Sequence, residues 1–180
     1  MNRMTYFFTR SEEGEAVKVP EGSEVETWAA TQFQDYISVV FMGENHGWND
    51  EIDELIRQQQ EILSMQEAQK GKFIVIGLPT GTAEERKELE AALSETYGDK
   101  FFNIREYMST QALEDAGIKP TDEDKARMAE GMVPSSLLTD HIHFNAEGYR
   151  LLGEQIYERM KKLGYFEELE GIVEEYGSVF

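Results

Sequence analysis

The sequence predicts an α/β fold in which helices cover both faces of a parallel sheet. Nearly continuous apolar runs at residues 37–42 and 73–78 have the composition of strands that are buried on both faces. A segment in which apolar residues recur at helical spacing follows the first run, and a capped helical segment follows the second. Strand, loop and helix therefore recur from residue 37 onward, which is the order of right-handed βαβ units.

A small antiparallel β meander is expected before the first buried strand. Residues 4–8 are predicted to form a short strand, and residues 15–19 and 24–28 alternate between polar and apolar side chains. We therefore divide the chain into a meander over residues 1–35 and an α/β domain over residues 36–180.

The first two helices of the α/β domain are predicted from their caps and their apolar spacing. Asn49 is the expected N-cap of a helix whose apolar residues lie between positions 52 and 63. Thr82 and Glu85 have the spacing of a capping box and predict a helix that continues to about residue 97. Gly98 then supplies a C-terminal stop for this helix.

Four further segments complete the predicted domain. A third short strand is expected at residues 101–104, and short helices are expected at residues 110–116 and 121–130. A long final helix is expected at residues 146–163, because apolar side chains recur there at helical spacing. The residues of this apolar stripe are Tyr149, Leu152, Ile156, Met160 and Leu163.

The charge balance of the chain excludes some classes of partner. The 180 residues suit one domain, and they include 36 acidic but only 17 basic residues, for a net charge of -19. Nucleic acids and anionic membrane surfaces need clustered lysine and arginine, so we expect neither as a partner. We interpret the excess of acid mainly as a contribution to solubility.

The absence of cysteine and of apolar segments restricts the chemistry and the location. With no cysteine in the chain, disulfides, thiolate catalysis and cysteine-bound zinc are excluded. The first residues lack the apolar region of a signal peptide, and no run approaches the roughly 20 apolar residues of a membrane span. As it stands the chain is expected to be cytoplasmic, provided that Met1 is a true start.

All three histidines fall in two polar loops. His46 lies in the loop of residues 43–50, directly after the first buried strand, while His141 and His143 lie at residues 139–145, directly before the final helix. Ligand sites of open α/β sheets lie at the carboxyl ends of the strands. We therefore expect the two loops to meet at that edge of the sheet.

Asp140 and His143 are the candidate acid–base pair. A carboxylate on the Nδ1 atom of histidine fixes the tautomer and stabilises the imidazolium that forms when the ring takes up a proton. A short loop allows residues three apart to face each other, although the same spacing also suits a helix cap beside a surface histidine. Asn45, flanked by Gly43 and Gly47, is a candidate donor to a developing oxyanion, with an ordinary turn after a strand as the alternative.

A divalent metal site is a minor alternative for the same loops. His141 and His143 alternate along the chain and could meet one ion together with His46, Asp50 or Asp140. The chain has no other metal motif, so we expect no metal and no cofactor.

Trp48 and Tyr149 are the aromatic residues nearest to the candidate chemistry. We expect both to pack against the sheet, with the lining of a substrate pocket as the alternative.

The order of these motifs resembles the SGNH (GDSL) hydrolase family over residues 37–163. The shared pattern is a strand, Gly-x-Asn, a helix, a strand, Gly-Leu-Pro, and finally Asp-x-x-His-x-Asn-x-x-Gly-Tyr at residues 140–149. The resemblance implies a three-layer, flavodoxin-like parallel sheet. It also implies that Asp140 and His143 belong to a Ser-His-Asp triad, that Asn45 donates to the oxyanion, and that Gly43 and Gly47 belong to the same loop. The implied substrate is a small acyl ester, such as an O-acetylated sugar.

The Gly-Asp-Ser block that supplies the nucleophile in this family is missing from the chain. The nearest string, Gly22-Ser23-Glu24, places Ser23 only 22 residues before Asn45 and on a predicted hairpin. We therefore expect a C-terminal part of such a hydrolase, incomplete at the N-terminal side of its sheet, with the meander as the end of an insertion. The chain alone should then be inactive or nearly so.

A non-catalytic, acidic interaction module on an α/β scaffold is the alternative from another functional class. An exposed sheet edge favours self-association as a homo-oligomer, or pairing with a complementary segment.

Overall fold

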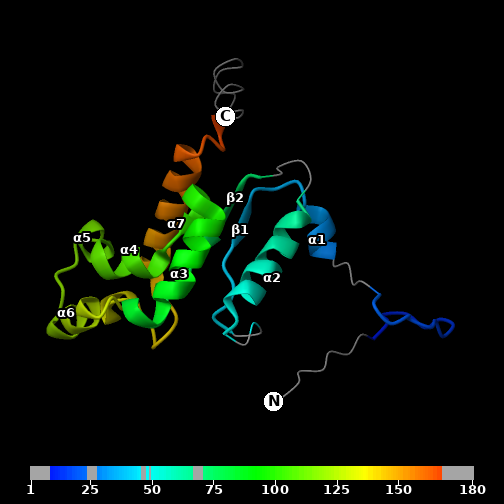
Figure 1. Cartoon of the computed structure of the whole chain (residues 1–180), viewed down its shortest axis with the longest axis horizontal. Coiled ribbons are helices and arrows are strands. Elements are labelled where there is room, and N and C mark those ends of the chain that lie inside the picture. The colour runs from blue at the N-terminus through cyan, green and yellow to red at the C-terminus, as the bar shows by residue number, and fades with distance from the viewer. Residues whose placement is uncertain (1–8, 24–27, 46–47, 49, 67–70, 168–180) are drawn as a thin grey trace.

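The computed structural model describes residues 9–23, 28–45, 48, 50–66 and 71–167, and it is an α/β structure (Figure 1). Three parallel strands form the sheet in the order β1-β2-β3, with β1 at Ser38–Val40, β2 at Phe73–Ile76 and β3 at Phe101–Phe102. Ser38 pairs with Phe73 and Val75 with Phe101, so β2 is the central strand.

Seven α-helices lie in the described part of the chain. In chain order they are α1 (Trp28–Phe33), α2 (Ile52–Ser64), α3 (Ala83–Tyr97), α4 (Ile104–Thr110), α5 (Ala112–Asp115), α6 (Asp122–Ala129) and α7 (Ala146–Lys162), and two 3-10 turns, η1 (Gly98–Lys100) and η2 (Ser135–Leu137), separate some of them.

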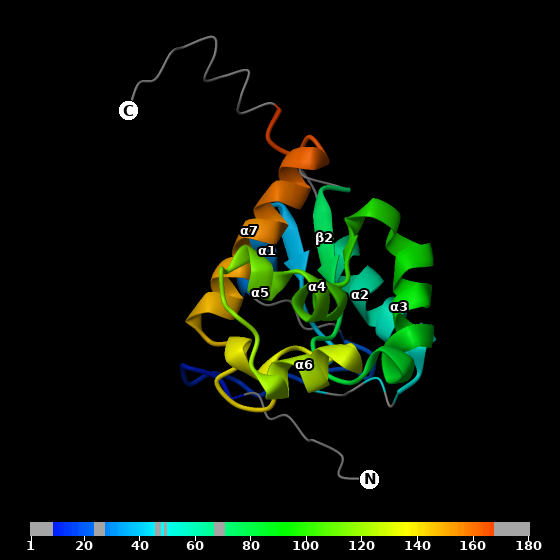
Figure 2. The same cartoon turned by 90° about the vertical axis from the view of Figure 1, so that its left-hand side faces the viewer.

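Helices pack on both faces of the sheet, as predicted, because successive strand residues point to opposite sides. Ile74, Ile76 and Phe102 contribute to an apolar cluster with residues of α4, α5 and α7. Val75 and Phe101 contribute to a second cluster with residues of α2 and α3. Figure 2 shows α7 and α3 on opposite sides of β2.

Helix α3 begins where its side-chain cap predicts. Thr82 accepts a hydrogen bond from the backbone N–H of Glu85, and the Glu85 side chain accepts one from the backbone N–H of Thr82. This capping box starts α3, and the backbone N–H of Gly98 donates to Ser94 at its end. The predicted final helix is also confirmed, with α7 covering Ala146–Lys162.

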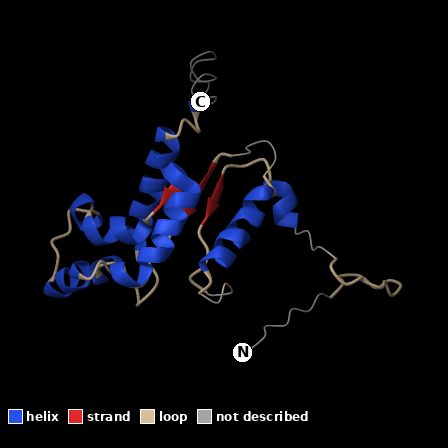
Figure 3. Ribbon diagram, viewed as in Figure 1, coloured by secondary structure: helices blue, strands red, loops and turns tan. Residues whose placement is uncertain are grey.

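The expected N-terminal meander is not formed in the described residues. Residues 15–19 are irregular loop rather than strand, and Trp28 begins α1 instead of ending a strand (Figure 3). Residues 4–8 and 24–27 lie outside the described part. Residues 15–19 alternate between polar and apolar side chains, but all five are exposed. Without an apolar surface of the described residues to pack against, this alternation does not favour a strand.

Other boundaries differ from the predictions by a few residues. The strands are shorter than the apolar runs, and Ile104, expected in a strand, begins α4 because Asn103 caps it with a bond from the N–H of Glu106. Asn49 lies outside the described residues, and the N-cap position of α2 is Glu51, whose side chain makes no capping bond.

The loops that follow the strands meet the loop before α7 at the carboxyl edge of the sheet. β1 leads into residues 41–45, β2 leads into residues 77–82, and both segments share pockets with residues 141–144. Among the helices of the described chain, none has the length and apolarity to cross a membrane.

Candidate functional site

Asp140 and His143 are in direct contact. The Nδ1 atom of His143 lies 2.8 Å from Oδ2 of Asp140, while Oδ1 of Asp140 accepts hydrogen bonds of 2.8 Å from the backbone N–H groups of Ile142 and His143. The bonds from the backbone N–H and the ring of His143, followed by the bond from Ile142, lower the pKa of Asp140 far below its ordinary range.

This geometry fixes the tautomer of the imidazole. Because Asp140 is ionised, it can only accept, so the Nδ1 atom of His143 carries the proton and donates it. Nε2 is then the ring nitrogen that faces away from Asp140 and can accept a proton. Both side chains remain accessible, with 67% of the His143 side chain and 46% of the Asp140 side chain exposed.

Backbone hydrogen bonds close the loop that carries this pair. The N–H of Thr139 donates to the carbonyl of His143 at 2.8 Å, and the N–H of Asn145 donates to the carbonyl of Leu137 at 2.9 Å. Leu138 and Phe144 form an antiparallel bridge between these two bonds. The loop is therefore a small closed hairpin.

Asn145 connects this hairpin to α7 and to the preceding 3-10 turn. Its Oδ1 atom accepts from the N–H of Gly148 at 3.0 Å, which caps the helix, and its Nδ2 group donates to the carbonyl of Ser136 at 2.9 Å. A Cβ atom on Gly148 would lie 2.7 Å from the carbonyl oxygen of Leu137 and 2.9 Å from Cβ of Phe144. The glycine thus allows α7 to approach the base of the hairpin.

A glycine also shapes the loop after β1. Gly43 has φ 121, and a Cβ atom there would lie 3.0 Å from Leu78 and 3.1 Å from Leu55. The indole N–H of Trp48 donates to the Gly43 carbonyl at 2.8 Å, and Trp48 itself is buried. Trp48 shares an apolar cluster with the strand residues Val40 and Val75, so the expectation that it packs against the sheet is confirmed.

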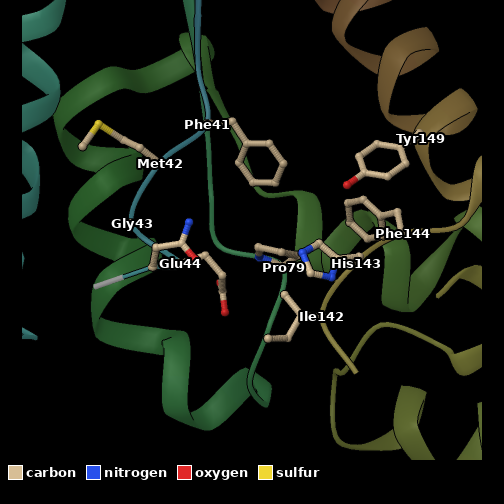
Figure 4. A pocket seen from close by; sticks show the side chains of 10 residues that line it. Phe41, Met42, Gly43, Glu44, Pro79, Ile142, His143, Phe144 and Tyr149 are labelled. Atoms are coloured by element: carbon tan, nitrogen blue, oxygen red, sulfur yellow. The ribbon is translucent and has the colours of Figure 1, made fainter. Parts of the chain in front are cut away.

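The two predicted loops line one pocket of about 170 Å³. Asn45 and Gly43 contribute from the loop after β1, and His143 contributes from the hairpin before α7. The remaining lining residues are Phe41, Met42, Glu44, Pro79, Ile142, Phe144 and Tyr149. Figure 4 shows the His143 ring beside Pro79, with Phe41 and Phe144 above it and Glu44 on the other side of Pro79.

Tyr149 lies in this pocket rather than against the sheet, so the packing expectation was wrong for this residue. Its side chain is half exposed, and its ring meets that of Phe144 edge-on, with 5.5 Å between the ring centroids. Tyr149 lies in the first turn of α7, next to the hairpin that carries His143. At this end of the helix the apolar stripe faces the pocket and not the core. Its hydroxyl group points toward Phe41 (Figure 4).

The remaining predicted residues lie apart from the pair or outside the described chain. His46 and Gly47 are outside it. His141 is exposed and lines a neighbouring pocket with Thr80 and Arg127. Ser23 lies in a loop, where its hydroxyl donates to the carbonyl of Pro20, and it is not a lining residue of the His143 pocket.

No group of three or more His, Cys, Asp or Glu side chains within the described ranges is arranged to hold a metal ion.

Glu44 is a lining residue that the sequence did not single out. Its Oε1 atom accepts a hydrogen bond from the hydroxyl of Thr80, and this bond joins the loop after β1 to the loop after β2. The guanidinium of Arg86 donates to the hydroxyl oxygen of Thr80 at 3.0 Å and to its carbonyl at 2.8 Å. The only signal in the sequence was the position of Glu44 between Gly43 and Asn45.

Comparison of the chain with models of protein families, with curated proteins and with solved structures found no match.

Proposed function

We propose that the chain carries the acid–base pair and one oxyanion donor of an SGNH-type ester hydrolase site. The observation that supports this proposal most is the hydrogen bond between Asp140 and His143 beside a pocket that Asn45 also lines. In the proposed reaction the free Nε2 of His143 removes the proton from a nucleophilic hydroxyl and later returns it to the leaving alcohol. Asp140 stabilises the intervening imidazolium, and the Asn45 amide donates to the oxyanion.

The architecture is compatible with a flavodoxin-like sheet that extends beyond β1. In this proposal, helices on both faces and a site at the carboxyl edge follow the general rule for open parallel sheets. β1 is an edge strand, and its Val39 side chain is 44% exposed, so a further strand there would cover apolar surface.

In this proposal, the nucleophile of the complete site does not come from the described residues that line the His143 pocket. The lining side chains of the His143 pocket include no serine, threonine or cysteine in the described part of the chain. Water activated by His143 is then the nucleophile available to the chain alone. We therefore expect slow, His143-dependent hydrolysis of activated esters and no reaction with serine-directed probes.

Hydrolysis of p-nitrophenyl acetate by matched histidine variants tests the proposal. His143→Gln should remove most of the rate above buffer, because the free Nε2 base is lost. His141→Gln is the control, since it removes an exposed imidazole from the same hairpin without touching Asp140. Equal rates in the two variants would contradict the proposed role of His143.

A fluorophosphonate probe tests the position of the nucleophile. Absence of labelling is the expected result for the chain alone. Stoichiometric labelling of a serine in this chain would overturn that part of the proposal, and peptide mass analysis would identify the residue.

An interaction module is the second candidate, and it is favoured by an apolar groove along β1. The groove has a volume of about 520 Å³, and its exposed lining residues are Phe33, Tyr36, Val39, Phe41 and Ile62. Sedimentation at several concentrations should then show association that Val39→Lys removes and that the control Val17→Lys, in the exposed N-terminal loop, leaves intact. A constant monomer mass at all concentrations would exclude self-association through this groove.

A further inference from the structure

Glu44 holds a buried acceptor that lacks a partner. While its Oε1 accepts from Thr80, its Oε2 is buried and has no hydrogen-bond partner among the described residues. A buried carboxylate oxygen without a donor is unfavourable, and the free energy lost is largest for a charged group. A ligand that brings a donor to this oxygen would remove the penalty.

Glu44 lines the His143 pocket, and its buried Oε2 reaches a ligand there once the carboxylate turns. The last torsion of a glutamate side chain is broad, so a small rotation of the carboxylate turns Oε2 toward a bound molecule. The bonds from Arg86 to Thr80 keep the hydroxyl of Thr80 oriented for Oε1, so that Oε2 is the oxygen left for the ligand.

The charges around the pocket restrict the ligand further. Among the described lining residues there is no lysine or arginine, while Glu44 is acidic and ionised Asp140 lies directly behind His143. An anionic ester would bring a like charge next to Glu44, which is unfavourable. A neutral hydroxyl or a cationic ammonium group instead supplies a donor to the unpartnered oxygen.

We propose that Glu44 determines specificity, and that the pocket prefers small esters with a hydroxyl or ammonium donor near the ester group and rejects anionic esters. This inference rests on the proposed function, because it places the ester carbonyl between His143 and Asn45. A cavity of about 170 Å³ is smaller than the usual site for a drug-sized molecule, so the ligand has a short acyl chain.

Four acetate esters of similar size separate the possibilities in titrations followed by NMR. They are 2-hydroxyethyl acetate, protonated 2-(dimethylamino)ethyl acetate, propyl acetate without a donor, and anionic acetoxyacetate. The two donor esters should bind the wild-type chain at least about tenfold more tightly than propyl acetate, and acetoxyacetate should bind most weakly. Equal affinities for the first three esters, or no binding of any of them, would overturn the inference without any variant being made.

Glu44→Gln shows which donor the site prefers. A glutamine keeps an oxygen for Thr80 but places an amide donor where Oε2 was, so the preference for the ammonium ester should disappear. A hydroxyl can also accept, so the hydroxyl ester should lose less affinity. Glu51→Gln is the control, because it removes the same charge from an exposed position outside the pocket. An unchanged ammonium preference in Glu44→Gln would contradict the assignment to Glu44.

The two proposals fail in different ways. If hydrolysis depends on His143 but the esters bind equally, only the role of Glu44 is refuted. If the donor esters bind preferentially but hydrolysis does not depend on His143, only the hydrolytic role of the pocket is refuted.

Discussion

Replacing Asp124 by asparagine should strongly destabilise the fold, because the carboxylate is a buried hub of hydrogen bonds. Oδ2 accepts from the backbone N–H and hydroxyl of Thr121 and from the hydroxyl of Ser136, and Oδ1 accepts from the hydroxyl of Ser135 and the N–H of Ser136. Asp124 is fully buried. These bonds join the start of α6 to the 3-10 turn η2.

The magnitude follows from the partners that an asparagine cannot satisfy. Asparagine loses the least stability when its amide nitrogen takes the place of Oδ1. Its carbonyl oxygen then still accepts the three hydrogen bonds that Oδ2 accepts in the wild type. The Ser135 hydroxyl can rotate to accept, but the N–H of Ser136 loses its acceptor, at about 1–3 kcal/mol. The remaining bonds also lose their charge assistance, so we expect a total loss of about 3 kcal/mol. This is a large part of the roughly 5–15 kcal/mol that stabilises a typical domain.

The pH dependence has a definite sign. Burial alone would raise the pKa of Asp124, but bonds from Ser136 and Thr121 outweigh it and lower the pKa far below its ordinary 3.8. A lowered pKa in the folded state contributes stability that is present above the unfolded value and is lost as the pH falls toward the folded value. The difference between wild type and Asp124→Asn should therefore be largest near pH 7 and should shrink below about pH 4.

Urea unfolding followed by circular dichroism at pH 7 and at pH 3 measures both effects. Asp122→Asn is the matched control, because Asp122 lies on the same helix, is fully exposed and, within the described residues, forms its ion pair with the exposed Lys125. We expect this control to change stability by less than about 0.5 kcal/mol. A loss below about 1 kcal/mol in Asp124→Asn at pH 7, or a difference that grows as the pH falls, would refute the reasoning.

Two further predictions concern packing. Gly148→Ala should cost about 2 kcal/mol, because the new methyl group would meet the Leu137 carbonyl and Phe144. On the same helix, a Cβ atom at Gly153 would meet no other side chain of the described residues within 4 Å, so Gly153→Ala should gain about 0.5–1 kcal/mol from helix propensity. Thermal unfolding of both variants measures the two changes in stability. Equal changes would contradict the close approach of α7 to Leu137 and Phe144. Gln59→Met should stabilise the protein by about 1 kcal/mol in urea unfolding, because the Gln59 amide is fully buried and has no partner in the described residues. A loss of stability there would show that the amide is satisfied.

Local interactions explain which features were predictable from the sequence. The capping box of Thr82 and Glu85, and the bond between Asp140 and His143, both join residues only three positions apart. Such contacts depend on a few backbone torsions, and therefore appear directly in residue spacing. The buried strands were predictable for a similar reason, since a continuous apolar run has few alternatives to burial in a parallel sheet. The N-terminal meander failed because alternation without a partner surface does not specify a strand.

By itself, the sequence determined the α/β order, the capping box of α3 and the pairing of Asp140 with His143. Only the tertiary structure decided which distant side chains share the pocket. Glu44, Pro79 and Tyr149 come from three separate segments. Parallel pairing brings the carboxyl ends of β1 and β2 together, and the first turn of α7 lines the same pocket. It also decided that Gly148 must lack a side chain, because the carbonyl of Leu137 approaches it from another element. Contacts of this kind depend on how whole elements pack, and residue spacing along the chain carries no record of that packing.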